Sequence, residues 1–167
     1  MTENPRGIVV FDVDGVLADV RHRLHHVEKR PKDWDAFFAA MDDDGPLDDG
    51  IALAQRYADE GHRIAYLTGR NESYRELTVA WMRRHGLPEG RLVMRRDDDR
   101  RPARVFKPQA LSRLAREGAI VAVVDDDTAV VEVLRHEGWP VLLADWMDAD
   151  DEQQGSLFDA QEVDGRS

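Results

Sequence analysis

Short apolar runs alternate with helical patterns along most of the chain. The apolar runs are continuous and rich in Val, Ile and Leu, which is typical of strands buried on both faces of a sheet. They cover residues 8–13, 64–68, 91–94, 120–126 and 140–144. The helical patterns cover residues 51–60, 72–85, 108–117 and 128–137. This alternation predicts an α/β fold, namely a doubly wound (Rossmann-like) parallel sheet with right-handed crossovers.

One segment, at about residues 18–47, interrupts the alternation because it is too long for an ordinary connection. Apolar residues inside it follow the i, i+3, i+4, i+7 spacing of an amphipathic helix: Trp34, Phe37, Phe38 and Met41. We interpret the segment as a small helical cap insert over the end of the first strand. The aromatic side chains are expected to pack this cap onto the body.

Polar residues gather where the predicted strands end, and ligands bind at that edge in doubly wound sheets. Asp12 and Asp14 follow the first strand. Other segments bring further candidates to the same edge: Thr68, Gly69 and Arg70 after the second strand, Lys107 before the third helix, and Asp125, Asp126 and Asp127 after the fourth strand. Each has an ordinary explanation on its own, such as helix capping before Thr128. Their convergence indicates one site.

The clustered carboxylates predict a metal site. Carboxylates at close range raise each other's cost of ionisation, and a bound cation removes that cost. Mg²⁺ prefers oxygen ligands, including carboxylates, water and phosphate oxygens. We therefore expect Mg²⁺ as cofactor, with ligands from Asp12, Asp14, Asp125 and Asp126.

The same residues predict phosphoryl-transfer chemistry. With a cation neutralising the cluster, Asp12 is expected to act as a nucleophile toward phosphorus and to form an aspartyl-phosphate. Asp14 is expected to protonate the leaving oxygen and then to deprotonate the attacking water. Thr68 and Lys107 are expected to hold the phosphoryl oxygens.

These motifs resemble, in order and spacing, the four motifs of the haloacid dehalogenase superfamily of phosphohydrolases. The matching stretches are "DVDGV", "LTGR", Lys107 and "VVDDD", and the resemblance covers roughly residues 7–145. It implies the same sheet, a magnesium dependence and an aspartyl-phosphate route.

A narrower resemblance concerns the substrate. "LTGRNESYRELTVAWMRRHGLP", "LVMRR", "VFK" and "VVDDDTAVVEVLRHEGWPV" are similar to the 3′-phosphatase domain of bacteriophage-type polynucleotide kinase. This implies that Arg23, eleven residues after Asp12, and Arg70 contact the substrate phosphate, with Gly69 in the same motif. The chain departs from that family at Ala103, where an acid is expected four residues before Lys107. It contains no P-loop of the form GxxxxGK[ST], so no kinase site is expected in it.

The net charge of −11 is unevenly distributed. Residues 145–167 hold eight acids and one base, whereas residues 70–107 hold eleven Lys or Arg and six acids. Overall acidity excludes a non-specific duplex-coating protein, because such binding depends on many phosphate contacts. It leaves room for a basic patch that binds one strand end.

Three functions are considered. A 3′-phosphatase acting on DNA or RNA ends is favoured by Arg23, Arg70 and the local positive charge. A phosphatase of free nucleotides or other small phosphomonoesters is favoured by the small cap and the overall acidity. A non-catalytic binding module is disfavoured by the complete set of catalytic residues.

The chain has no cysteine, no signal-peptide pattern and no membrane-length apolar run, so we expect a cytoplasmic protein without a membrane partner. Residues 1–146 are predicted to form the phosphatase domain, and 147–167 an acidic, disordered tail. Within that tail, Gln154, Leu157 and Phe158 resemble the pentapeptide by which bacterial replication and repair proteins bind the sliding clamp. The alternatives are that Leu157 and Phe158 pack on the domain or have no role.

Overall fold

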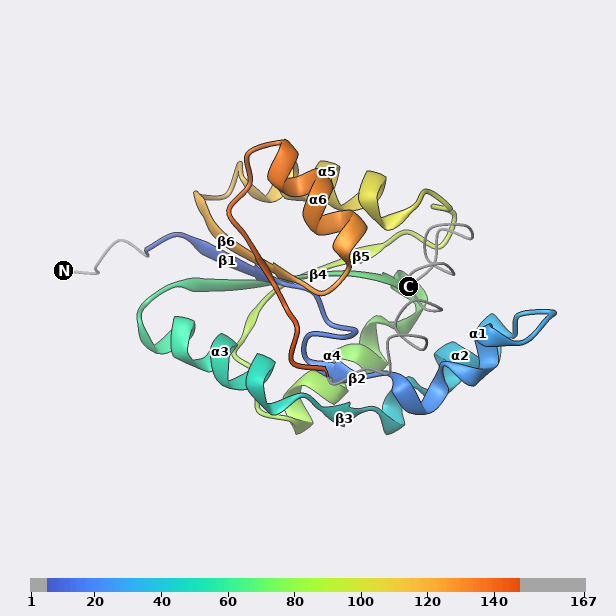
Figure 1. Ribbon diagram of the computed structural model, residues 1–167. Coiled ribbons are helices and arrows are strands. Elements are labelled where there is room, and N and C mark those ends of the chain that lie inside the picture. The colour runs from blue at the N-terminus through green and yellow to red at the C-terminus, as the bar shows by residue number, and fades with distance from the viewer. Residues whose placement is uncertain (1–5, 148–167) are drawn as a thin grey trace.

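The computed structural model describes residues 6–147, and its central feature is a five-stranded sheet (Figure 1). The strand order is β5-β4-β1-β6-β7, and every neighbouring pair is parallel. The strands are β1 (Ile8–Phe11), β4 (Arg63–Asn71), β5 (Gly90–Arg95), β6 (Ile120–Asp125) and β7 (Val141–Leu143). The predicted doubly wound α/β fold is confirmed.

Helices cover both faces of this sheet: α3 (Asp48–Asp59) and α4 (Arg75–Arg84) on one face, α5 (Ala103–Leu114) and α6 (Thr128–His136) on the other (Figure 1). Strand β1 is buried between the two layers. Its Val9 and Phe11 side chains belong to the core under α3 and α4, whereas Val10 belongs to the core under α5 and α6. The continuous apolar run in the sequence therefore marks a central strand.

Helix α5 begins earlier than predicted. The pattern placed the helix at residues 108–117 with Lys107 in front of it, but α5 begins at Ala103 and contains Lys107 and Pro108. The residue before its first turn is Pro102, with φ of −55°, and the fixed φ of proline is compatible with a helix start. Lys107 therefore projects from inside the helix and not from the loop before it.

The predicted insert leaves the body and returns to it through a short antiparallel pair, β2 (Ala18–Asp19) with β3 (Gly45–Pro46). Between these strands lie the 3₁₀ helix η1 (Arg21–Arg23), α1 (His25–Glu28), α2 (Trp34–Ala39) and the 3₁₀ helix η2 (Ala40–Asp43). The cap extends away from the body beyond the end of the sheet (Figure 1). The single helix predicted around the aromatic residues is thus divided into α2 and η2.

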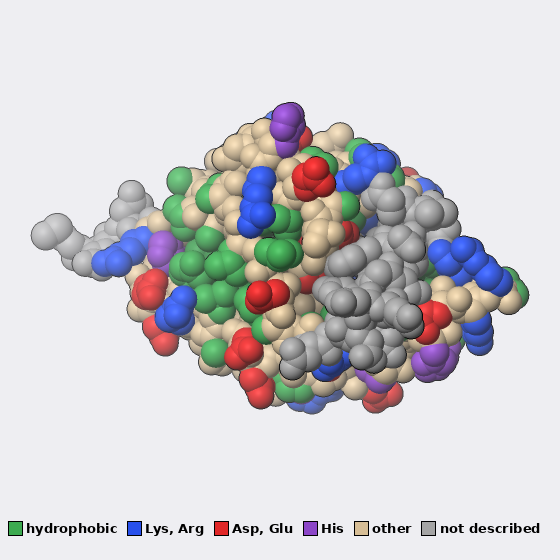
Figure 2. Space-filling model, in the orientation of Figure 1, with side chains coloured by type: hydrophobic (Ala, Val, Ile, Leu, Met, Phe, Trp, Pro, Cys, Tyr) green, Lys and Arg blue, Asp and Glu red, His purple; other side chains and the backbone are tan. Residues whose placement is uncertain are grey.

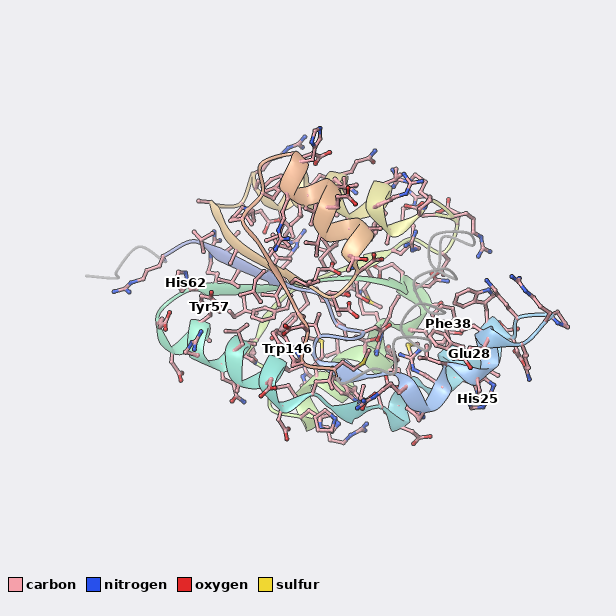
Figure 3. The ribbon with its side chains drawn as sticks, in the orientation of Figure 1. His25, Glu28, Phe38, Tyr57, His62 and Trp146 are labelled. Atoms are coloured by element: carbon pink, nitrogen blue, oxygen red, sulfur yellow. The ribbon has the colours of Figure 1, made fainter. Side chains whose placement is uncertain are left out.

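The cap has a small hydrophobic core of its own. Phe37, Phe38 and Met41 are buried in it, and Tyr74 and Leu77 of the body pack against it. The ring of Phe38 lies 5.3 Å from the ring of Tyr74, at the junction of cap and body (Figure 3). The aromatic residues therefore attach the cap to the body, as interpreted from the sequence.

In the part of the chain that the structure describes, no helix is both long and apolar enough to cross a membrane. Gln154, Leu157 and Phe158, the predicted clamp-binding residues, lie outside the described residues, as does all of the predicted tail except Met147.

Candidate active site

The carboxyl ends of β1 and β6 are neighbours where the sheet topology reverses, which is the usual ligand position in such folds. Asp12 directly follows β1, and Asp125 ends β6. The Lys107 ammonium lies between them, with Nζ 2.7 Å from Asp125 Oδ2 and 3.2 Å from Asp12 Oδ2. We call these three residues and Asp126 the strand-end cluster; all four are buried.

Three carboxylates of this cluster form a candidate metal site. One oxygen each of Asp12, Asp125 and Asp126 lies within 4.8 Å of the other two, and among the described residues no other group of three is placed in this way. Asp126 Oδ2 is buried and has no hydrogen-bond partner within residues 6–147. An oxygen-only donor set with an uncommitted carboxylate oxygen fits a hard divalent cation.

The electrostatics of the site also favour a cation. Burial raises the pKa of Asp12 to about 8, because the nearby charge of Asp125 adds to burial and the two outweigh Lys107. Burial, with the charges of Asp12 and Asp125, raises the pKa of Asp126 well above its ordinary value. Without a cation, full ionisation of this cluster is therefore unfavourable.

The buried charges of the described chain can be counted. If all of them were ionised, six carboxylates would stand against four cations, an excess of two negative charges: Asp12, Asp14, Asp44, Asp125, Asp126 and Asp127 against Arg23, Arg70, Arg95 and Lys107. One divalent cation would neutralise this excess.

Gly15, in the turn after Asp14, allows the close approach of Asp126. Its φ of +79° lies in the left-handed region that favours glycine. A Cβ at this position would also collide with the Asp126 carboxylate. The turn is further held by Trp146, whose Nε1 donates a hydrogen bond of 2.9 Å to the Val16 carbonyl (Figure 3).

The Asp14 carboxylate lies outside the metal group, although the sequence predicted it as a ligand. Its Oδ1 accepts hydrogen bonds from Arg70 Nε at 3.0 Å and Arg70 Nη2 at 2.6 Å, and from Arg23 Nη2 at 3.1 Å. Burial raises the pKa of Asp14, but Arg70 and Arg23 outweigh this effect and the pKa is lowered. The two arginines therefore favour the ionised form of Asp14.

A second carboxylate in contact with these arginines was missed by the sequence reasoning. Asp44 Oδ1 accepts from Arg23 Nε at 2.8 Å, and Asp44 Oδ2 accepts from Arg23 Nη2 at 2.9 Å and from Arg70 Nη2 at 3.0 Å. We call Asp14, Arg23, Asp44 and Arg70 the arginine–aspartate cluster; all four are buried.

A sequence signal for Asp44 does exist. It lies three residues after Met41, on the helical face that carries the buried apolar stripe of the cap, whereas Asp42 and Asp43 are exposed. Continuing the helical spacing of the apolar stripe by three residues beyond Met41 predicts that Asp44 is the buried member of the run of three acids.

Thr68 and Gly69 lie within β4, which continues past its predicted end to Asn71. Thr68 Oγ1 accepts a hydrogen bond of 3.1 Å from the Arg70 backbone N–H. The Gly69 carbonyl accepts one of 3.1 Å from Nε of Arg95, a buried residue that the sequence reasoning also missed. The structure thus shows both residues supporting the segment that carries Arg70, and their assignment to phosphate binding stays a prediction.

Asp127 has the capping role considered from the sequence. Its Oδ1 accepts hydrogen bonds from the backbone N–H groups of Ala129 at 2.9 Å and Val130 at 3.3 Å, at the start of α6.

Solved structures of other proteins share the fold of this chain. A haloacid dehalogenase-like hydrolase from Bacteroides fragilis has a TM-score of 0.60 and 14% identity, with 89% of this chain and 92% of that chain covered. The class C acid phosphatase from Bacillus anthracis with tungstate bound has a TM-score of 0.62 and 15% identity, with coverage of 94% and 80%. The chain therefore has the fold of the haloacid dehalogenase superfamily.

The family follows from the sequence. A profile of the polynucleotide kinase PNKP phosphatase domain matches residues 6–146, and the chain belongs to this family of phosphatases. A chain of the Pnkp1/Rnl/Hen1 complex is also similar, with a TM-score of 0.68 and 22% identity over 86% of the present chain. The match covers 47% of the length of that larger chain. A search among proteins with curated descriptions found no match. None of these comparisons supports binding to a sliding clamp.

Proposed function

We propose that the chain is a Mg²⁺-dependent phosphomonoesterase that removes the 3′-phosphate from DNA or RNA ends through an aspartyl-phosphate. The observation that carries this proposal is the pair of carboxylates after β1. Asp12 lies beside Lys107 in the strand-end cluster, and Asp14, two residues on, is held by two arginines. This arrangement supports attack on phosphorus by Asp12 and proton transfer by Asp14.

In the first step, a carboxylate oxygen of Asp12 attacks phosphorus and the bond from phosphorus to the 3′ oxygen breaks. With substrate bound, the protonated form of Asp14 would give a proton from Oδ2 to that leaving oxygen. It then takes a proton from the water that attacks the aspartyl-phosphate, so inorganic phosphate is released and Asp12 is regenerated. Asp14 Oδ2 is suited to this role because it is buried and forms no hydrogen bond in the described structure.

Asp12, Asp125 and Asp126 would hold the Mg²⁺ ion. When bound, this ion would supply positive charge to the phosphoryl oxygens in the transition state. The unpartnered Asp126 oxygen and the excess of two buried negative charges support this assignment.

Cationic side chains would bind the transferring phosphoryl group. The Lys107 ammonium is 3.2 Å from the proposed nucleophile, so it would neutralise charge on the phosphoryl oxygens. Arg23 and Arg70 are proposed to contribute further phosphate contacts, with Thr68 and Gly69 beside them. Both arginines are paired with Asp14 and Asp44 in the structure, so these contacts rest on the family resemblance.

The cap supports a polynucleotide substrate over a small one. Residues 21–32 hold five Lys or Arg and one acid. Lys29 and Arg30 are exposed in the loop between α1 and α2, which forms the outer end of the cap (Figure 1). Basic side chains gather at that end of the molecule (Figure 2). Such residues can contact backbone phosphates beyond the terminal nucleotide. A second structure similar to this chain is described as a Pnkp1/Rnl/Hen1 RNA repair complex, so RNA ends are tested alongside DNA ends.

The test compares phosphate release, with Mg²⁺, from 3′-phosphorylated DNA and RNA oligonucleotides, a 3′-mononucleotide and a 5′-mononucleotide. We expect kcat/KM to be highest for a 3′-phosphorylated oligonucleotide. The Asp12→Asn protein, purified in the same way, controls for contaminating phosphatases. A preference for the 5′-mononucleotide would contradict the proposal and favour a phosphatase of free nucleotides.

A further inference from the structure

We propose that Asp44 is a positioning residue: acting through Arg23 and Arg70, it leaves one oxygen of Asp14 uncommitted for proton transfer. This inference rests on the proposed function and adds to it a residue that contacts neither substrate nor metal in that scheme.

The contacts of Asp44 show that it is the main partner of Arg23. Arg23 presents its Nε and Nη2 to the two oxygens of Asp44, at 2.8 and 2.9 Å, in the two-pronged geometry typical of strong arginine–carboxylate pairs. Asp44 Oδ2 also accepts from Arg70 Nη2 at 3.0 Å. Asp44 thus lies against both guanidinium groups, and its side chain is fully buried.

The consequence appears at Asp14. All of its contacts with Arg23 and Arg70 reach Oδ1, and Oδ2 has no hydrogen-bond partner in the part of the chain that the structure describes. Two buried guanidinium groups need two carboxylates for charge balance. If Asp44 carried no charge, the paired N–H groups of Arg23 would have Asp14 as their remaining carboxylate and would compete for its free oxygen. Asp44 therefore binds the N–H groups of Arg23 that would otherwise compete for Asp14 Oδ2.

Asp44 is itself held by both parts of the molecule. Its backbone N–H donates a hydrogen bond of 3.1 Å to the Met41 carbonyl in the cap. Its own carbonyl accepts a hydrogen bond of 2.8 Å from Trp81 Nε1 of α4. His22 Nε2 lies 2.7 Å from Asp44 Oδ1. Asp44 and Arg23 come from the cap, so the seating of the cap on the body determines how Asp14 is held.

The test uses two leaving groups, because general acid catalysis matters only when the leaving oxygen needs a proton. The 3′-phosphorylated oligonucleotide has an alkoxide leaving group, whereas 2,4-dinitrophenyl phosphate releases a phenolate that leaves unprotonated. First-turnover rates are measured with excess enzyme, so the later hydrolysis of the phosphoenzyme does not contribute. For Asp44→Asn we expect a fall of about a hundredfold on the oligonucleotide and less than about threefold on dinitrophenyl phosphate.

Two further variants make this result specific. Asp43→Asn is the matched control, since Asp43 is the exposed neighbour of Asp44, and it should leave both rates unchanged. Trp81→Phe keeps the charge of Asp44, removes the hydrogen bond to its carbonyl and leaves a smaller ring in the core. We expect it to lower the oligonucleotide rate several-fold more than the dinitrophenyl phosphate rate, and it replaces Asp44→Asn as the deciding variant if that protein does not fold.

Thermal melting establishes that each variant is folded before its rates are compared. An equal fall of both rates in folded Asp44→Asn would overturn the inference, because Asp44 would then support phosphate binding or general structure alone. Unchanged rates would overturn it as well. A wild-type protein that hydrolyses dinitrophenyl phosphate but no 3′-phosphorylated oligonucleotide would instead overturn the proposed function.

Discussion

The strand-end cluster and the arginine–aspartate cluster are both buried and charged, but they differ in charge balance and in construction. The strand-end cluster has three carboxylates and one cation, whereas the arginine–aspartate cluster has two of each. The first is built entirely from the body, at the ends of β1 and β6 and on α5. The second joins Asp14 and Arg70 of the body to Arg23 and Asp44 of the cap. An unbalanced cluster is suited to binding a cation and reacting with phosphate, and a balanced one to fixing orientation.

The largest expected effect is at the centre of the strand-end cluster. Asp12→Asn should lower kcat/KM for a 3′-phosphorylated oligonucleotide by about 10⁴-fold or more, because an amide cannot replace a carboxylate nucleophile. Its melting temperature without metal should not fall, since an amide keeps the size of the side chain and replaces a carboxyl group whose ionisation is unfavourable there. Phosphate release and thermal melting measure the two effects. Activity near that of the wild type would contradict the covalent role of Asp12.

The two clusters should respond differently to removal of the metal. A chelator should abolish activity, and Mg²⁺ should restore it, whereas Ca²⁺ should not, because Ca²⁺ prefers more ligands and longer bonds. Mg²⁺ should also raise the melting temperature by several degrees, since it binds the folded state. This increase should shrink in Asp126→Asn and persist in Arg70→Ala. Full activity in excess chelator would contradict the metal assignment.

Loss of an arginine should have a smaller effect than loss of Asp12. Arg70→Ala and Arg23→Ala should each reduce kcat/KM for the oligonucleotide by about tenfold to a thousandfold, through lost charge-assisted hydrogen bonds. Arg84→Ala is the matched control, because Arg84 lies on the surface and pairs with exposed Asp42. Equal activities of Arg70→Ala and Arg84→Ala would contradict a role of the arginine–aspartate cluster in catalysis.

The smallest effect is expected at the outer end of the cap. Replacing Lys29 and Arg30 together by alanine should raise KM for an oligonucleotide by about threefold at low salt, and this difference should decrease as salt increases. KM for dinitrophenyl phosphate should stay the same, since that substrate does not extend along the cap. The same change of KM on both substrates would contradict a polynucleotide contact at this surface.

The strand-end cluster could be predicted from the sequence for a clear physical reason. Apolar runs locate parallel strands, and the residues that follow them meet at one edge, so Asp12 and Asp125 were expected together. Lys107 was expected at that edge even though the start of its helix was misplaced. A helical turn rises about 5.4 Å, and the long side chain of a lysine can span that distance.

The arginine–aspartate cluster was only partly predictable. Arg23 and Arg70 were identified by resemblance, but their partner Asp44 lies in a run of three acids, and the folding of the cap decides which of them is buried. The clustered carboxylates predicted that Asp14 binds metal together with Asp12, and this assignment stays a prediction. The Asp14 carboxylate points away from the strand-end cluster because it binds Arg23 and Arg70, which also bind Asp44. These residues come from separate segments, so no local sequence pattern predicts their contacts.

The most direct test of the account is the time course of Asp14→Asn with 2,4-dinitrophenyl phosphate and Mg²⁺. This phenolate leaves without a proton, so Asp12 should still be phosphorylated, whereas the water that hydrolyses the aspartyl-phosphate would lack its base. The account predicts a rapid burst of one phenolate per protein molecule, then a much slower phase, with the phosphate found on Asp12 by mass spectrometry. A linear release at the wild-type rate, with no phosphate on Asp12, would contradict it.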